Sequence, residues 1–308
     1  MNQSNTSNDS SPQQSVQRRN HLIGLGLAIF GAILFSAKAI VAKLLYAYQL
    51  DAVTVLAFRM LFALPVFAAI AWWQSRKQPP LCVSDRWRLI GLGLVGYYLS
   101  SFLDFLGLQF ISAGLERLIL FLTPSFVLFI HVVWFKRQIR PIEYVSLAIA
   151  YAGIVLVFIH DLSFHGQQVV LGASLVLGSA LAYATYLVQS GEIVGRIGSL
   201  RLVSYAMCIS SLACVAQFFL LRPASLLIQA WPVISLSIAN AIACTVFPVF
   251  LTMFAIQKIG APKASQAGMI GPVSTLVLGT LFLNEAVTMW QVSGASCVIF
   301  GMYLLSRK

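Results

Sequence analysis

The feature that most restricts the possible folds is an internal repeat: residues 103–156 recur, without a gap, as residues 251–304. A chain built from two copies of one unit is expected to fold as two related halves. At the constant spacing of 148 residues, the identical pairs include Gln109 and Gln257, Ile111 and Ile259, Ala113 and Ala261, Pro124 and Pro272, Leu128 and Leu276, and Gly153 and Gly301.

The composition places both copies in a membrane. Of the 308 residues, 59% are hydrophobic and only 9% are charged, which leaves too little polar surface for a water-soluble globule. Apolar runs of about 18 or more residues are typical of helices that cross a bilayer. We therefore expect an all-α integral membrane protein with ten transmembrane helices, over residues 22–46, 53–73, 88–109, 113–135, 142–159, 169–190, 202–221, 232–256, 264–283 and 288–305.

The basic residues predict the orientation of these helices. If the N-terminus is cytoplasmic, fifteen of the twenty Lys and Arg residues fall in cytoplasmic segments, whereas Asp51, Asp161 and Glu285 fall outside. The positive-inside rule then predicts that both termini are cytoplasmic, in a multi-pass protein of the cell inner (plasma) membrane. The net charge of +11 follows from this arrangement, so we expect no nucleic-acid partner. Because five helices separate equivalent points, the two copies are predicted to be inverted relative to each other.

The chain divides into three predicted parts. Residues 1–20 are rich in Ser, Asn and Gln and show no apolar period, which is typical of a disordered cytoplasmic tail. Residues 21–160 form the first predicted five-helix repeat, and residues 169–306 form the second. The five Cys and four His residues are scattered, and none of them has the spacing of a zinc site. No GxxxxGK[ST] motif for ATP occurs either, so we expect no cofactor and no metal.

Charged residues lie deep within the predicted helices, where a charge near the bilayer centre costs on the order of 2.5–3.5 kcal/mol. They are Lys38, Arg59, Asp104, Glu116 and Arg117. A rise of about 1.5 Å per residue places Arg59 and Asp104 roughly 9 Å from the outer ends of their helices, and Lys38 roughly 12 Å. Charges of both signs share one level, which predicts a common polar cavity. The alternative is that these groups only tie the helices together.

Polar and aromatic residues extend this predicted cavity. Tyr97 and Ser101 continue the helix face of Asp104 at i, i+4 and i+7 spacing. The second copy contributes Tyr183 and Tyr186 along one stripe of its first helix.

Two prolines at equivalent positions are predicted to kink their helices. Thr123 precedes Pro124, and Gly271 precedes Pro272. A proline frees a backbone carbonyl, which membrane proteins tolerate beside a cavity or a neighbouring helix. We therefore assign Thr123 and Gly271 to the candidate substrate site, with a purely structural kink as the alternative.

Three stretches carry a resemblance to a known family: AFRMLFAL around Arg59, LQFISAGLERLILFLTPSF in the first copy, and IQKIGAPKASQAGMIGPVSTLVLGTLFLNEAVT in the second. They resemble the EamA family of the drug/metabolite transporter superfamily, and the resemblance covers essentially the whole chain after the tail. It implies two inverted five-helix repeats, a central cavity, and export or exchange of small metabolites, often amino acids. The family's elbow glutamate is present as Glu285 but replaced by Arg137 in the first copy, so it is assigned no transport role.

Inverted repeats with a site near their interface are typical of secondary transporters. We expect a secondary transporter that exports or exchanges small polar metabolites, such as amino acids, by alternating access. Arg59 or Lys38 is the candidate to hold a substrate carboxylate. Asp104 or Glu116 is the candidate to carry a coupling proton, because a desolvated carboxylate binds a proton more readily.

Two other functions are left open by the residues. A channel-like permease is one, although the sequence lacks a ring of like charges or a carbonyl filter motif. A lipid-modifying membrane enzyme is the other, with Asp104, Glu116 and His131 as acid/base groups. His131 lies about four helical turns from Glu116, more than roughly 20 Å, so we expect no enzyme. The expected partners are a small-molecule substrate and the lipid bilayer, with the chain as a monomer or a homodimer.

Overall fold

The computed structural model describes residues 12–136, 138 and 140–306, and the regular elements within these residues are all helices. In chain order they are α1 (Pro12–Ala47), α2 (Ala52–Lys77), α3 (Val83–Leu92), η1 (Gly93–Leu99), α4 (Ser100–Leu108), α5 (Ala113–Leu120), α6 (Thr123–Phe135), α7 (Pro141–His165), α8 (Gln168–Ile197), α9 (Ser199–Leu221), η2 (Ala224–Leu227), α10 (Trp231–Ala241), η3 (Ile242–Val246), α11 (Phe247–Ile259), α12 (Ala261–Ala267), η4 (Gly268–Ile270), α13 (Gly271–Leu283) and α14 (Met289–Ser306).

Each of the ten predicted apolar segments is helical. Two of them, Gly268–Leu283 and Met289–Leu305, are shorter than 18 residues. Helix α1 begins at Pro12, inside the segment predicted to be a disordered tail, and residues 1–11 lie outside the described part of the chain. Within the described residues, eight continuous helical spans are long and apolar enough to cross a membrane: Arg19–Ala47, Ala52–Lys77, Val83–Leu108, Ala113–Trp134, Pro141–Ser163, Gln168–Ile197, Ser199–Leu221 and Trp231–Ile259.

Local chemistry explains where several helices begin and end. Asp51 caps α2, because its side chain accepts a hydrogen bond from the backbone N–H of Val53. Ser112 caps α5 in the same way through the N–H of Leu115. At the other end of α2, Arg76 and Lys77 occupy the last turn, where basic side chains favour the helix dipole.

The irregular features of the backbone repeat at the same spacing as the sequence. The π-helical turn η1 has its counterpart in η3, and the break between α5 and α6 has its counterpart in the 3₁₀ turn η4. Lys136 and Asn284, which are 148 residues apart, both end their helices in the left-handed conformation. The predicted duplication is therefore a structural duplication, down to its deviations from regular helix.

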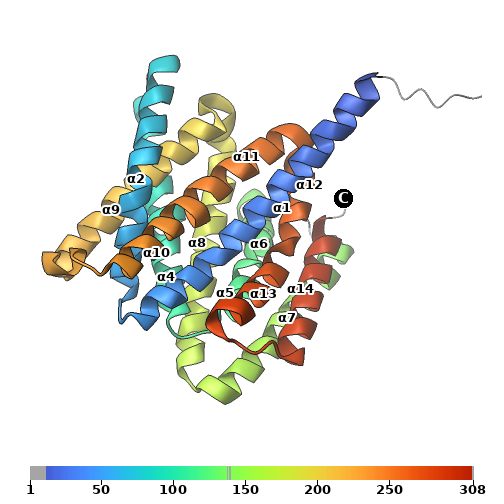
Figure 1. Cartoon of the computed structure of the whole chain (residues 1–308). Coiled ribbons are helices and arrows are strands. Elements are labelled where there is room, and N and C mark those ends of the chain that lie inside the picture. Colours follow the sequence, from blue (N-terminus) through green and yellow to red (C-terminus); the bar gives the residue numbers. More distant parts are fainter. Residues whose placement is uncertain (1–11, 137, 139, 307–308) are drawn as a thin grey trace, which may run out of the picture.

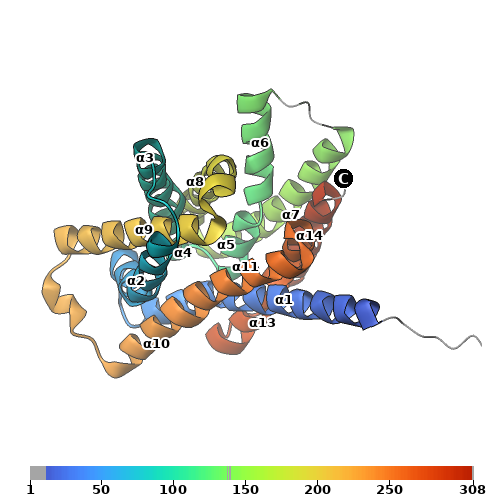
Figure 2. The same cartoon turned by 90° about the horizontal axis from the view of Figure 1, so that it is seen from above.

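The two copies run in opposite directions. In Figure 1, α1 descends from the upper right while its counterpart α8 rises, and α7 descends beside a rising α14. Helices α7 and α14 pack together at one side of the bundle and α2 and α9 at the other, with α1, α8 and α11 between them (Figures 1 and 2). We call the end where α1 begins the inner end, because the charge pattern predicts that it faces the cytoplasm.

The buried apolar residues form two main clusters. The first surrounds Phe105 and Met60 and joins α1, α2, α4 and the second copy's α9 to α11. The second surrounds Leu118 and Ile119 and joins α5, α7, α8 and α14. The polar site described next is lined in part by residues of both clusters, among them Met207 of the first and Leu120 and Phe121 of the second.

Candidate functional site

A cavity of about 210 Å³ lies at the centre of the bundle. The π-helical turn η1 widens one helix at this level and places Gly96 and Tyr97 on its wall. The structure brings eight of the predicted site residues to the lining of this central cavity: Lys38, Arg59, Tyr97, Ser101, Asp104, Arg117, Thr123 and Tyr183.

Three predicted site residues lie behind the lining instead. Glu116 is fully buried, with one carboxylate oxygen 3.3 Å from Lys38 Nζ. The ring of Tyr186 packs edge-on against Tyr97 at 4.8 Å between centroids. Gly271 lies beside the guanidinium of Arg117, where it has no side chain to compete for space.

The acidic residues of the site share one lysine. Lys38 Nζ hydrogen-bonds the Asp104 carboxylate and forms an ion pair with Glu116. All three side chains are at least nine-tenths buried, so the two carboxylates and the ammonium depend on each other for charge compensation. The second carboxylate oxygen of Asp104, Oδ1, has no hydrogen-bond partner among the described residues.

The guanidinium of Arg59 is held by a hydrogen bond and a ring contact, but one of its N–H donors has no partner among the described residues. Its Nε donates a hydrogen bond to Thr245 Oγ1 at 2.7 Å, and Thr245 in turn donates to the Asn240 carbonyl at 2.9 Å. Its guanidinium carbon lies 5.1 Å from the centre of the Phe105 ring, which supports the cation from one side. Arg59 Nη1 is buried and has no partner within the described chain. The site thus contains a fixed cation with a free donor.

Arg117 is the third cation of the cavity. Its guanidinium carbon lies 5.3 Å from the centre of the Phe35 ring, and its Nε is buried without a hydrogen-bond partner among the residues described. The missing side chain of Gly271 makes room for it, since a Cβ at that position would lie 2.7 Å from Arg117 Nη2.

The two copies contribute different chemistry to equivalent places in the wall. Each charged first-copy residue of the site has an uncharged counterpart 148 residues later. For several equivalent pairs, charged or not, both members line the cavity. The charged residues that line the cavity therefore all belong to the first copy. These pairs are Arg59 and Met207, Tyr97 and Thr245, Ser101 and Val249, and Phe35 and Tyr183.

Met207 and Val249 were not among the predicted site residues, because neither has a chemical signature of its own. The signal that would have found them is the repeat spacing applied to Arg59 and Ser101. Thr245 would also have followed from Tyr97 in this way.

Further cavities lie around the central one. An inner vestibule of about 530 Å³ shares Phe35, Arg117, Leu120 and Phe121 with it. An outer pocket of about 490 Å³ contains the ion pair of Lys43 and Glu285, at 3.6 Å. Arg137, the counterpart of Glu285, lies outside the described residues.

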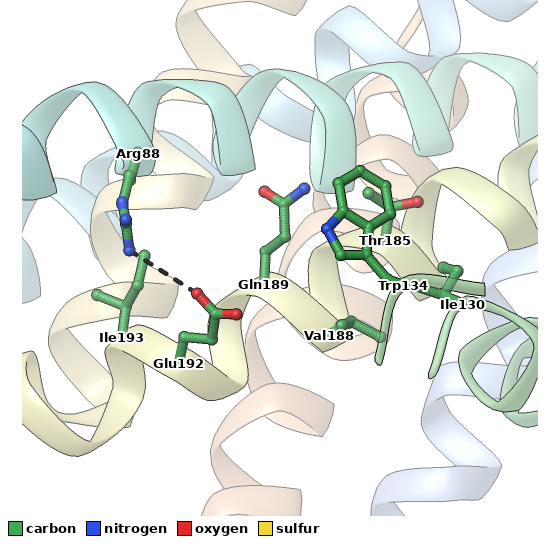
Figure 3. A pocket seen from close by; sticks show the side chains of 8 residues that line it. All are labelled: Arg88, Ile130, Trp134, Thr185, Val188, Gln189, Glu192 and Ile193. Atoms are coloured by element: carbon green, nitrogen blue, oxygen red, sulfur yellow. Dashed lines mark ion pairs between the residues drawn. The ribbon is translucent and has the colours of Figure 1, made fainter. Parts of the chain in front are cut away.

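A groove of about 290 Å³ near the inner end is shown in Figure 3. Arg88 of α3 points across it toward Glu192 of α8, with 3.8 Å between the charged atoms (Figure 3). Both side chains are half exposed, so this pair adds little stability. The groove contains none of the predicted site residues.

An inverted repeat of membrane-crossing helices around a charged central cavity is typical of membrane transporters. The sequence pattern of the EamA-like transporter family matches residues 22–159 and again residues 170–307. The chain therefore belongs to the EamA-like transporter family.

Its relatives have transporter names. The uncharacterized transporter YcbK of Bacillus subtilis (strain 168) is 32% identical over 295 residues, which cover 92% of each chain. The threonine/homoserine exporter RhtA of Escherichia coli (strain K12) is 27% identical over 212 residues, 68% of each chain. A protein of known crystal structure shares the fold with a TM-score of 0.64 at 16% identity, covering 94% of this chain and 96% of that one.

Proposed function

We propose that this protein is a secondary transporter of the inner membrane that exports or exchanges small polar metabolites, such as amino acids, by alternating access. The observation that carries the proposal is a pair of buried, unpartnered groups in one cavity: the donor Arg59 Nη1 and the acceptor Asp104 Oδ1. A carboxylate satisfies the first and an ammonium group satisfies the second. An unpaired buried polar group is costly, so a ligand that pairs both is favoured.

The charge of the site supports a substrate with a carboxylate. Lys38, Arg59 and Arg117 carry three positive charges, whereas Asp104 and Glu116 carry two negative ones when ionised. The remaining positive charge lies in a low-dielectric interior, where electrostatic attraction for an anionic group is strong. The name of RhtA, a threonine/homoserine exporter, agrees with an amino acid as substrate.

The asymmetry of the two copies supports alternating access. The inner vestibule is open beside Thr252, Ile256 and Met302. Of their first-copy counterparts, Asp104 lines the central cavity, whereas Leu108 and Ile154 are buried among packed helices. Inverted repeats alternate access when the copies exchange these two packing arrangements. A vestibule at the predicted cytoplasmic end supports loading of substrate from the cytoplasm, as an exporter requires.

The test is uptake of labelled amino acids into proteoliposomes, with and without an imposed pH gradient. We expect saturable uptake by wild type and at least a tenfold loss in Arg59→Met, because a charge-assisted hydrogen bond contributes about 1.5–3 kcal/mol. Arg222→Met is the matched control, since Arg222 pairs with Asp51 in the outer loops and is absent from the cavity lining. Uptake that is equal in wild type and Arg59→Met would contradict the proposal.

The coupling proton is tested in the same vesicles. The carboxylates of Asp104 and Glu116 share Lys38, so one of them is expected to bind a proton when the pair rearranges. Asp104→Asn or Glu116→Gln should abolish the stimulation of uptake by a pH gradient. If both variants keep the transport rate and its pH dependence, neither residue carries a proton.

A further inference from the structure

The lining of the inner vestibule is mainly apolar, and one of its described residues is charged. Its volume is about 530 Å³, and its walls are formed mainly by apolar side chains and glycines of α1, α11, η4 and α14. Arg117 is the one charged residue that lines it within the described part of the chain. No carboxylate of the described residues contributes to the lining there, so a bound ammonium group finds no opposite charge.

Arg117 is available to a ligand. Its side chain is 9% exposed, its Nε lacks a hydrogen-bond partner, and no carboxylate among the described residues lies within ion-pair distance of it. The Phe35 ring and the backbone of Gly271 hold the guanidinium where the vestibule meets the central cavity. An arginine in this setting binds a carboxylate oxygen through charge-assisted hydrogen bonds.

We propose that the inner vestibule is a binding site for an organic monocarboxylate with an apolar group, whose carboxylate binds Arg117 and whose apolar group packs against Ile256, Met269 and Met302. The site differs from the central cavity, which Asp104 lines, because no carboxylate of the described residues lines it. Its role as the loading site of the transport path rests on the proposed transport function, whereas ligand binding to it does not.

The lining residues that the two spaces share indicate a path for a ligand from the inner vestibule to the central cavity. Phe35, Arg117, Leu120 and Phe121 line both spaces, so a single layer of side chains separates them. Movement of the Arg117 side chain by one rotamer would carry a bound carboxylate from the vestibule toward Arg59. Arg117 is thus the residue common to loading and to central binding.

Gly268 offers a way to fill the vestibule without disturbing its walls. It lines the vestibule but not the central cavity, and a side chain added there would meet nothing within 4 Å. Gly26 of α1 has the same free space but lines neither cavity. Gly268→Phe is therefore the test variant, and Gly26→Phe is its matched control.

The experiment is equilibrium binding of radiolabelled phenylacetate to the full-length protein in nanodiscs, with empty nanodiscs subtracted. We expect saturable binding that unlabelled phenylacetate displaces and that phenethylamine, which has an ammonium in place of the carboxylate, does not. Gly268→Phe should weaken binding at least tenfold and Gly26→Phe less than twofold. Arg117→Met should lose binding, and Arg117→Lys should retain part of it. The thermal transition of each variant checks that it is folded.

Binding that survives Gly268→Phe, or that phenethylamine displaces equally well, would overturn the proposal. Absence of saturable binding to wild type would overturn it too, and would favour a lipid acyl chain as the occupant. These results are independent of the amino-acid uptake assay. If wild type binds phenylacetate but takes up no labelled amino acid, only the proposed transport function is refuted.

Discussion

The close contact between Gly271 and Arg117 can be tested by adding one methyl group at position 271. In Gly271→Ala the new Cβ would lie 2.7 Å from Arg117 Nη2, and the flexible end of the arginine can move away. We therefore expect a transition temperature equal to or above wild type, because Ala is favoured over Gly in helices by roughly 0.5–1 kcal/mol. Amino-acid uptake should fall at least fivefold, since the guanidinium is displaced from the cavity.

Gly178→Ala is the matched control for this substitution. Its Cβ would meet only Leu103 Cδ1, at an ordinary contact distance of 3.4 Å, and Gly178 lies outside the cavity lining. Uptake by the control should stay within twofold of wild type. Equal uptake in Gly271→Ala and the control would remove Arg117 from the substrate site.

Asp51 connects the outer loops of the two copies and makes stability depend on pH. Partial burial alone would raise the pKa of Asp51, but hydrogen bonds from Arg222 and Thr54 outweigh it and lower the pKa below its ordinary value. The carboxylate therefore adds stability at neutral pH, and this contribution is lost as the pH falls through the lowered pKa.

Asp51→Asn keeps the helix cap and removes only the charge. Because both partners of the pair are about one-third exposed, we expect a loss of at most about 1 kcal/mol at pH 7. The difference in transition temperature between wild type and variant should stay constant from neutral pH down to about pH 5 and then shrink as the pH falls through the lowered pKa. Arg222→Gln should show the same decrease. A difference that does not shrink at acid pH would mean that the Asp51 charge is not its cause.

The charged residues of the site could be predicted because a membrane interior makes each charge informative by itself. Lys38, Arg59 and Asp104 were assigned to one level from helix depth alone. Their partners could not be predicted, since Arg59 and Thr245 are 186 residues apart and meet only through the packing of α2 against η3. The burial of Glu116 behind Lys38 likewise results from tertiary packing, which the periodicity of the sequence does not predict.

Helices α7 and α14 approach so closely that glycine is required at their crossing. A Cβ at Gly153 would lie 2.6 Å from the backbone oxygen of Gly294 and 2.7 Å from Cys297 Cβ. Unlike the arginine beside Gly271, a backbone atom cannot move aside at little cost. Gly153→Ala is expected to lower stability by about 1–3 kcal/mol, as overpacking does in protein cores.

The measurement is the thermal transition in detergent or nanodiscs. Gly195→Ala of α8, where an added Cβ would meet nothing within 4 Å, is the matched control and should be as stable as wild type or more so. An unchanged transition in Gly153→Ala would show that α7 and α14 are less tightly packed than described.

The elements divide into those that local sequence explains and those that it does not. Pro124 and Pro272 predicted a departure from regular helix at two equivalent positions, because a proline cannot donate the hydrogen bond that a continuous helix needs. The π-helical turns η1 and η3 had no such signal. In η1, the close packing of Gly93 against the Ala206 carbonyl and of Gly96 against the Tyr186 ring shows that tertiary contacts shape the turn.

The molecule as a whole is symmetric in backbone and asymmetric in chemistry. The repeat supplies two equivalent sets of helices, yet Lys38, Arg59 and Asp104 all come from the first set. A substrate with a charged end and an uncharged side chain matches such a cavity, with its charged end on the first copy and its side chain toward Met207 and Val249. The second asymmetry is that the inner vestibule shares lining residues with the central cavity, whereas the outer pocket shares none. In the proposed mechanism, transport reverses this asymmetry.

Counterflow is the most direct test of alternating access at the central cavity. Proteoliposomes are loaded with a high concentration of an unlabelled amino acid found in the uptake panel, and a trace of the labelled compound is added outside. A carrier takes the label up transiently above equilibrium, because its site returns loaded from the opposite side. We predict this overshoot for wild type and its absence in Arg59→Met. A monotonic approach to equilibrium in wild type would contradict the account and indicate a channel-like permease.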